Sequence, residues 1–494
     1  MGIIQRQGLK NTIITFAGIL LGFASLLYVQ PHFLTPEEIG LTRVLFSFSS
    51  LVGVFLPLGI GTITVKYFPI FRNYQNGHNG FFGLLLLYMF IGALVVFSIL
   101  LASRGFFISQ YEKQSALFTQ YYYCVLPFSL VIGFNAVLTL YCNSLFKSTF
   151  PALFNEVLVR VLSIILFTLY FIKLLSLNSF IFLFVGIYGM QTVCLLIYIY
   201  SVDSPSLNVN WPLLRKSNFR EIMIFGIWMS FVSVASLGIK FIDSLVLAKY
   251  YQLHLVGIYT IAAFIPNIIE APLNALERIA GTKVAHALTH NDHAEVEKIY
   301  YRSAQYLLLI GGLLFVGIVT NMQFLIQFLP PKFAGGLTVV YIISAAALFN
   351  IAGGANSQII FSSENFWKGG LLLISVAISS IILNVLLVPK WGMNGAAMAT
   401  AGSAGLYFIS KYIIIYKNFN LQPYSLKTFL ILLLIGICVF INIFLPVFTS
   451  NILNICVRTF TMSFVYLGGV LILNLAPELK EIFKHPSSFV GFKF

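Results

Sequence analysis

The chain has 494 residues, of which 59% are hydrophobic and only 9% are charged. Soluble domains carry about 25% charged residues, so a water-soluble fold is excluded. The formal net charge of +14 does not indicate a nucleic-acid-binding protein, because the basic residues lie at the ends of apolar segments rather than in one patch. The composition therefore predicts an all-α polytopic membrane protein.

Apolar segments of about twenty residues, long enough to cross a hydrocarbon core of about 30 Å, recur from Asn11 to Leu475. The sequence predicts about fourteen transmembrane helices, at residues 11–34, 38–65, 80–102, 117–143, 151–173, 178–200, 221–248, 254–277, 299–320, 335–361, 369–388, 393–416, 427–447 and 453–475. An even number of spans places both termini on the same side of the membrane.

The basic residues between the spans predict which side that is. About 19 Lys and Arg residues, Lys411 among them, fall on the side of the termini, and about 6 fall on the other. Cytoplasmic loops carry the excess of Lys and Arg, so both termini are predicted to be cytoplasmic.

The longest polar breaks, at residues 201–220 and 281–302, are too short to hold a catalytic domain. The first contains two prolines and a basic cluster, and it divides the spans into six and eight. We interpret it as a cytoplasmic linker. The predicted divisions are an N-terminal six-helix lobe at 1–200, the linker at 201–220, a C-terminal six-helix lobe at 221–417, two additional transmembrane helices at 418–475 and a cytoplasmic tail at 476–494.

A short repeat appears at the start of the second and eighth spans. Ile39-Gly40-Leu41 and Val256-Gly257-Ile258 each follow an aromatic residue and a short polar turn, at matching places in two six-span units. Two copies of an even-span unit have the same orientation, so their pseudo-twofold axis runs along the membrane normal. We therefore expect a substrate to bind between the two lobes.

These repeats, together with the segment from Leu383 to Thr400 and the opening Leu9-Lys10-Asn11-Thr12, resemble bacterial polysaccharide-export proteins. That family is the oligosaccharide (polysaccharide/O-antigen-type) flippase branch of the multidrug/oligosaccharidyl-lipid/polysaccharide exporter superfamily. The resemblance covers nearly the whole chain. It implies two six-helix lobes around a V-shaped cavity, two extra C-terminal helices, and a place in the bacterial cytoplasmic (inner) membrane.

The resemblance also implies the function. The expected substrate is a polyprenyl-pyrophosphate-linked oligosaccharide, carried from the cytoplasmic to the outer leaflet by alternating access for cell-surface polysaccharide biosynthesis. Expected partners are this lipid-linked oligosaccharide, membrane lipids, a coupling cation (proton or sodium) and other polysaccharide-assembly membrane proteins. No nucleic acid, catalytic residue, cofactor or metal is expected.

Ionisable residues inside the spans are the candidate site residues, because a charge near the middle of the membrane is costly unless it faces a cavity or a partner. The eighth span carries a polar stripe on one helical face, with prolines beside it that predict a kink. This span 8 stripe consists of Asn267, Glu270, Asn274 and Glu277. We interpret it as cavity lining, and the alternative is a polar seam between packed helices.

The seventh span repeats the pattern with Ser233, Ser236, Lys240 and Asp243. Lys240 and Asp243 either neutralise one another or have separate roles. In the second case Lys240 binds an anionic headgroup, and Asp243 either titrates or holds Lys240 in place.

Two further spans carry candidate cations. In the fifth span, Glu156 and Arg160 are four residues apart, so a local ion pair competes with a role in ligand binding. In the second, Arg43 follows Glu38 with no acidic residue in the next four positions, which makes it the freer cation. Arg and Lys suit a pyrophosphate because charge-assisted hydrogen bonds offset the cost of desolvating it. For sugar hydroxyls and rings, the inner spans offer Asn135, Asn350, Asn384 and Trp228.

Two other functions compete with the flippase. A cation-coupled multidrug exporter of the same superfamily typically has an acidic residue in its first span, and residues 11–34 contain none, although Asp243 and Glu270 remain available for coupling. A membrane glycan polymerase or ligase needs a larger outer loop than the sequence provides. The segment with His286, His290, Asp292 and His293 is interpreted as a solvated cytoplasmic helix rather than a metal site.

Overall fold

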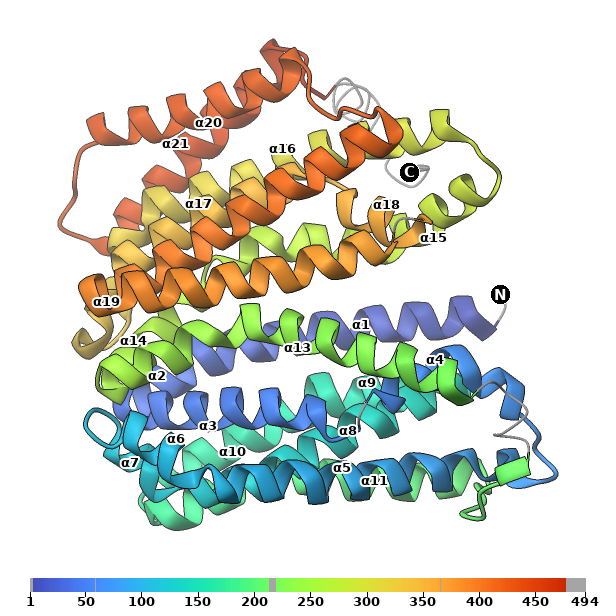
Figure 1. Ribbon diagram of the computed structural model, residues 1–494. Helices are drawn as coiled ribbons and strands as arrows, with labels where there is room; N and C mark the ends of the chain where they lie inside the picture. The colour runs from blue at the N-terminus through green and yellow to red at the C-terminus, as the bar shows by residue number, and fades with distance from the viewer. Residues whose placement is uncertain (1–2, 58, 213–218, 365, 477–494) are drawn as a thin grey trace. The chain divides into compact units, whose positions relative to one another are not determined.

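The computed structural model describes residues 3–57, 59–212, 219–364 and 366–476, and these residues form helices without a β-strand (Figure 1). The predicted tail, except for residue 476, and residues 213–218 of the predicted linker lie outside the described residues. Contacts within the described chain divide it into two compact units, Met1–Ile261 and Ala262–Phe494.

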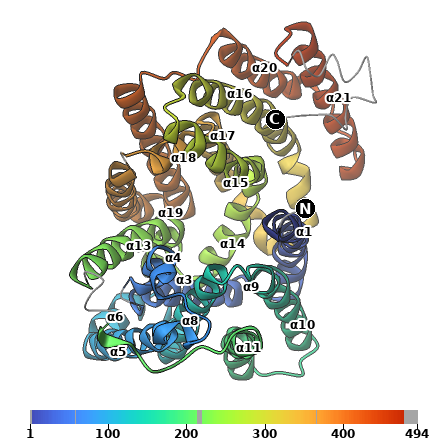
Figure 2. The same cartoon turned by 90° about the vertical axis from the view of Figure 1, so that its right-hand side faces the viewer.

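The first unit contains the first seven predicted spans and most of α14. Its elements are α1 (Ile3–Phe23), η1 (Ala24–Val29), α2 (Gln30–Phe33), α3 (Pro36–Phe55), α4 (Ile60–Phe71), η2 (Gly77–Gly80), α5 (Phe81–Ala102), α6 (Arg104–Tyr111), α7 (Ala116–Gln120), η3 (Tyr122–Cys124), α8 (Val125–Ser144), α9 (Thr149–Leu153), η4 (Phe154–Leu158), α10 (Val159–Phe171), α11 (Leu177–Val202), α13 (Phe219–Tyr250) and α14 (Leu253–Phe264). Figure 2 shows α1 beside α9 and α10, which it contacts.

The second unit contains the remaining helices. They are α15 (Asn267–Thr289), α16 (His293–Leu325), η5 (Ile326–Phe328), η6 (Pro331–Gly336), α17 (Leu337–Ala352), α18 (Asn356–Ser362), α19 (Phe366–Phe419), α20 (Leu426–Phe444) and α21 (Asn451–Ile472).

Among the described residues, twelve helices are long and apolar enough to cross a membrane, and thirteen if the bent pair α14 and α15 forms one span. The longest, α19, has 54 residues, or about 80 Å at 1.5 Å per residue, which is far more than one hydrocarbon core requires. It is interrupted at Gly392, whose φ is +55°. Its two halves correspond to the predicted spans 369–388 and 393–416, so all fourteen predicted segments have a helical counterpart.

The second predicted span, residues 38–65, is not one helix. It begins at a capping box, in which the Thr35 side chain accepts from the backbone N–H of Glu38 and Glu38 accepts from that of Thr35. It ends at Phe55, and α4 begins after Gly59, whose φ of +80° suits glycine. Pro57 in the break lacks a backbone N–H and cannot continue a helical ladder.

Two glycines of the sequence repeat pack against one another's helix. A Cβ on Gly40 would lie 2.0 Å from the carbonyl oxygen of Leu253, and one on Gly257 would lie 1.9 Å from that of Pro36. Each glycine therefore meets the residue four positions before the other glycine. This reciprocal contact between α3 and α14 is the pattern that a local twofold axis produces.

The helix α13 packs along both α3 and α4. At the second contact, a Cβ on Gly59 would lie 1.9 Å from the carbonyl oxygen of Gly226. This packing places α13 in the first unit, and the boundary between units falls within α14 rather than at residues 201–220. The predicted division into six-helix lobes remains a prediction.

The eighth predicted span is kinked, as the sequence predicts. The helices α14 and α15 are bent by 54° relative to one another at a short break that contains Pro266. Proline explains the break because its ring removes a backbone donor and clashes with the preceding turn.

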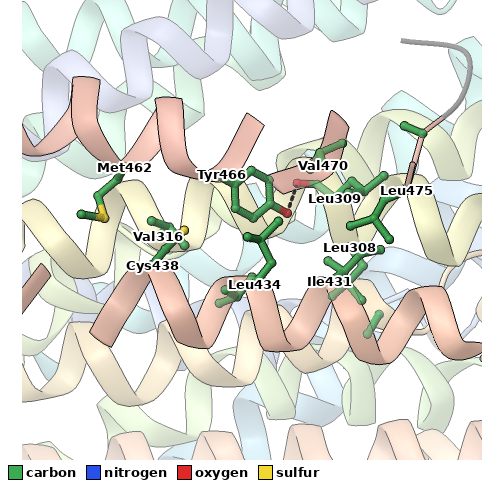
Figure 3. Close-up of a cluster of buried hydrophobic side chains, with 13 residues drawn as sticks. Leu308, Leu309, Val316, Ile431, Leu434, Cys438, Met462, Tyr466, Val470 and Leu475 are labelled. Carbon is green, nitrogen blue, oxygen red and sulfur yellow. Dashed lines mark hydrogen bonds between the residues drawn. The ribbon is translucent and has the colours of Figure 1, made fainter. Parts of the chain in front are cut away.

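The two additional helices, α20 and α21, pack on α16 around a hydrophobic cluster (Figure 3). Its largest side chain, Tyr466, is 1% exposed and donates from its hydroxyl to the carbonyl oxygen of Leu309 at 2.9 Å. Arg458 of α21 is 2% exposed and donates to the carbonyl oxygens of Asn442, Leu445 and Pro446 at the end of α20. Arg458 therefore caps α20, because the last carbonyl groups of a helix have no partner within it.

Candidate functional site

The first unit gathers five of the predicted site residues. They are Arg43 of α3, Lys240 and Asp243 of α13, Glu156 of η4 and Arg160 of α10, which we call the Arg43 cluster.

Arg43 lies where α3 meets α13. Its Nε donates to the hydroxyl oxygen of Ser244 at 3.3 Å, and its guanidinium carbon lies 5.2 Å from the ring centroid of Phe241. The charge of Asp243 also acts on Arg43. Asp243 is 7% exposed and accepts a hydrogen bond of 2.6 Å from the hydroxyl of Tyr259 on α14. Arg43 is thus positioned by contacts from a neighbouring helix, whereas Glu38 is occupied by its cap and by the hydroxyl of Tyr170.

Lys240 is the exposed cation of the cluster. Its ammonium lies 5.6 Å from the same Phe241 ring that Arg43 contacts, and the charges of Arg43, Glu156 and Arg160 act on it. Among the described residues, no carboxylate lies within 4.0 Å of its ammonium, so the structure does not pair it directly with Asp243. A cation with an aromatic ring on one side and an open side opposite is available to a ligand.

Glu156 and Arg160 form the local ion pair that their spacing allows, at 3.0 Å and with about a third of each side chain exposed. Arg160 also donates to the carbonyl oxygen of Gly18 on α1. A Cβ on Gly22, one turn further along α1, would lie 2.6 Å from the Arg160 guanidinium. The absence of a side chain at these two positions therefore lets α1 lie against the pair.

A network of aromatic and amide side chains, several of them buried, adjoins these charges. The ring of Phe46 lies 5.8 Å from those of Phe241 and Tyr188 and 5.9 Å from that of Phe128. The charge of Arg160 acts on Tyr188. Hydrogen bonds join Asn135, Asn155, Gln191 and Thr192 beside Tyr188. Of the residues predicted to serve sugars, Asn135 belongs to this network.

The Arg43 cluster contains three cations and two carboxylates, a formal net charge of +1. Charges removed from bulk water are retained only with partners, and here each carboxylate is accompanied by a donor while Lys240 remains open. The arrangement can therefore accept an anionic group next to aromatic and amide side chains.

The span 8 stripe belongs to the second unit. Asn267 and Asn274 are exposed, whereas Glu270 is half-buried and accepts from the side-chain amide of Asn350 at 2.9 Å. Glu277 is half-buried one helical turn beyond Asn274. The stripe's two amides and its two carboxylates therefore have different surroundings, and its role as cavity lining remains a prediction.

Sequence reasoning missed or misplaced several polar residues. Lys411 was counted as a cytoplasmic charge at the end of a span, but it is 2% exposed inside the second unit. Neither Tyr259 nor Ser244 was singled out, although both contact the Arg43 cluster. Tyr259 stands in the repeat around Gly257, and that position was the available signal. Asn384 is fully buried and donates to the carbonyl oxygen of Ser380 on its own helix.

The histidine segment lies at the end of α15 and the start of α16. The rings of His286 and His290 stack at 4.3 Å and are exposed. In the part of the chain that the structure describes, no three His, Cys, Asp or Glu side chains are grouped to hold a metal ion.

Comparison with known families finds one match that covers more than half of the chain. Residues 7–280 match the model of the family described as polysaccharide biosynthesis protein. An uncharacterized membrane protein of Methanocaldococcus jannaschii is 23% identical over 485 residues, which cover 90% of this chain and 91% of that relative.

Solved structures share the fold at low sequence identity. The lipid II flippase MurJ, in an inward closed conformation, is similar with a TM-score of 0.73 at 16% identity, over 94% of this chain and 98% of that one. An inward-facing multidrug resistance MATE family transporter of the MOP superfamily is similar with a TM-score of 0.62 at 15% identity, over 83% of this chain and 98% of that one. The described chain therefore has the helical fold of flippases and exporters.

Proposed function

Because the chain belongs to the polysaccharide biosynthesis protein family, we propose that it moves a polyprenyl-pyrophosphate-linked oligosaccharide from the cytoplasmic to the outer leaflet. The Arg43 cluster is the observation that carries this proposal. A pyrophosphate must lose water when it enters a protein-lined cavity, and charge-assisted hydrogen bonds from Arg and Lys offset that loss. The net formal charge of +1, with Lys240 exposed, matches an anionic headgroup.

The residues beside the cations suit the sugar part of the substrate. Aromatic rings such as Tyr188 and Phe46 offer faces for sugar rings, and the exposed amide of Asn155 offers a neutral donor and acceptor for hydroxyl groups, while the buried Asn135 and Gln191 support it. Asn267, Glu270 and Asn274 of the span 8 stripe are proposed to line the path from the second lobe. The amides of Asn267 and Asn274 supply neutral hydrogen bonds, which hold a glycan without trapping it.

Transport proceeds by alternating access between two lobes. The contacts of Gly40 and Gly257 join α3 to α14 at backbone distance, with no interlocking side chains at the two glycines. Such a contact separates without repacking a hydrophobic core, which fits a surface that opens once per cycle. Arg43 and Ser244 bridge α3 and α13 close to this contact, so opening it changes the surroundings of the headgroup site.

The proposed setting is the bacterial inner membrane, with both termini cytoplasmic, in keeping with the excess of basic residues on that side. Membrane lipids, a coupling cation and other polysaccharide-assembly membrane proteins are the proposed partners, and no catalytic step is assigned. A multidrug exporter is the alternative, since a multidrug transporter shares the fold. A site with net positive charge is poorly suited to cationic drugs, which favours the lipid-linked glycan.

The proposal is tested by complementation. A strain lacking its own flippase is supplied with this chain and with glycosyltransferases for a panel of lipid-linked glycans. We expect surface polysaccharide to return for at least one glycan, with no change in drug resistance. Drug resistance without polysaccharide, or neither phenotype at normal protein abundance, would contradict the proposal.

A further inference from the structure

Lys411 is a cation buried inside the second unit. It belongs to α19 and is 2% exposed, although the sequence places it near the end of a span. An ammonium group removed from water is costly unless its surroundings compensate for it. The identity of those surroundings therefore indicates what the group does.

Neutral groups make the direct contacts to Lys411. Its ammonium lies 4.1 Å from the ring centroid of Tyr407, one turn away on the same helix, and donates to the hydroxyl oxygen of Ser357 on α18 at 3.4 Å. Among the described residues, no carboxylate lies within 4.0 Å of it. The charges that act on Lys411 come from Glu277 and Glu270, both on α15.

A neutral amide from a neighbouring helix fixes each of these carboxylates. The amide of Asn350 on α17 donates to Glu270 at 2.9 Å, and the side chain of Gln358 on α18 bonds to Glu277. Space for Gln358 depends on α15, because a Cβ on Gly281 would lie 2.8 Å from its Oε1. We call Glu270, Glu277, Asn350, Ser357, Gln358, Tyr407 and Lys411 the Lys411 cluster.

The formal charge of the Lys411 cluster is −1, from two carboxylates and one ammonium. One more monovalent cation therefore neutralises it, and neutrality is the less costly state away from water. A sodium ion needs several oxygen ligands and is repelled by the ammonium. A proton needs one carboxylate oxygen and no coordination shell.

We propose that the Lys411 cluster exchanges one proton and that Lys411 occupies the position a bound metal cation would otherwise take. An O–H bond forms on Glu277 or Glu270 when the proton arrives and breaks when it leaves. Coupling this exchange to glycan movement rests on the proposed transport function. The exclusion of sodium does not.

Sodium binding to the purified full-length protein in lipid nanodiscs tests the role of Lys411. Thermal unfolding is followed as sodium chloride replaces choline chloride up to about 150 mM, at constant ionic strength. We expect the midpoint temperature of unfolding of the wild-type protein to stay constant as sodium is added. Lys411→Met leaves two carboxylates without their cation, so sodium should raise its midpoint by roughly 3 °C or more.

Three further variants make the result specific. Lys417→Met removes an exposed lysine of the same helix and should behave like the wild type. Lys411→Arg keeps the cation and should remain indifferent to sodium, and Glu277→Gln together with Lys411→Met should lose the sodium response. Stabilisation of the wild type by sodium, or a Lys411→Met protein that is indifferent to it, would overturn the proposal. If Lys411→Met does not fold, Lys411→Gln replaces it as the variant whose unfolding midpoint sodium must raise.

Transport gives a second, separate readout. In cells that export the glycan, a protonophore should stop export through the wild-type protein, and replacing external sodium by choline should not. Glu277→Gln should export less and respond less to external pH, whereas Lys417→Met should match the wild type. Sodium-dependent, protonophore-resistant export would overturn the proton assignment, and absence of export under every condition would count against the proposed function alone.

Discussion

The two charged clusters of the chain differ in burial and in sign. The Arg43 cluster has a net formal charge of +1 and an exposed lysine, and two of its three cations, Arg43 and Lys240, lie against the ring of Phe241. The Lys411 cluster has a net formal charge of −1, and its lysine is 2% exposed. An exposed, positive site suits a large anion that enters and leaves, whereas a buried, negative site admits only a small cation.

Removing both Arg43 and Lys240 from the Arg43 cluster should have the largest effect on transport. Each charge-assisted hydrogen bond to a phosphate contributes roughly 1.5 kcal/mol, so Arg43→Ala with Lys240→Ala should lower export by about 100-fold. Loss of the exposed Lys240 should leave stability near normal, whereas loss of Arg43 removes its contacts with Ser244 and Phe241, so export is normalised to the abundance of folded protein. Arg43→Lys should retain part of the activity. Export at the wild-type rate in the double variant would show that these cations do not hold the substrate.

The second largest effect is expected at the glycine contact between α3 and α14, which lies close to the Arg43 cluster. Gly257→Ala places a methyl group against the Pro36 carbonyl, where the ideal position would be 1.9 Å away. Overpacking of this kind costs about 3 kcal/mol, measurable as a lower unfolding midpoint together with reduced export. The matched control is Gly238→Ala on α13, because a Cβ there has no neighbour within 4 Å. Equal stability of the two variants would contradict the close packing of α3 and α14.

Arg458 shows what a buried cation does when its partners are uncharged: three backbone carbonyls, the side chain of Asn442 and the ring of Phe324. Arg458→Met removes the donor to the carbonyl oxygens of Leu445 and Pro446 and one of the donors to that of Asn442, and we expect a loss of about 2 kcal/mol in the free energy of unfolding. Export per folded molecule should not change, which separates this structural cation from Arg43. The two quantities are measured by thermal unfolding and by export normalised to membrane abundance. A specific loss of export at normal stability would instead place Arg458 in the transport path.

The smallest effect is expected at the ion pair beside α1. About a third of each side chain is exposed, so a double-mutant cycle of Glu156→Gln and Arg160→Gln should give a coupling of about 0.5 kcal/mol. Export should remain within a few-fold of the wild type, since Arg160 also donates to the backbone of Gly18. Loss of export as severe as that of the Arg43 and Lys240 double variant would assign Arg160 to substrate binding.

The transmembrane helices and the breaks between them could be predicted from the sequence because both are determined by neighbouring residues. Hydropathy over about twenty residues identifies a helix that crosses a membrane, and Pro266 and Gly392 mark the breaks where proline and glycine act on their own backbone. The ion pair of Glu156 and Arg160 was predictable for the same reason, since residues four apart share a helical face.

The Arg43 and Lys411 clusters are formed by residues from helices that are distant in the sequence, so the sequence predicted them only in part. It identified Arg43, Lys240 and Asp243 as intramembrane charges, but the Ser244, Phe241 and Tyr259 contacts depend on how three helices pack. Lys411 was misplaced because a lysine near the end of a span usually reaches solvent. Its burial depends on α15 and α18, which are distant in the sequence.

Binding of two lipids that differ only in the headgroup tests the proposed role of the Arg43 cluster. Polyprenyl pyrophosphate and the corresponding neutral polyprenol are titrated into purified protein in nanodiscs, for the wild type and for Arg43→Ala with Lys240→Ala. We predict that the wild type binds the pyrophosphate at least tenfold more tightly, that salt weakens this preference, and that the double variant loses it. Equal binding of both lipids by the wild type, or an undiminished preference in the double variant, would show that the cluster does not bind the headgroup.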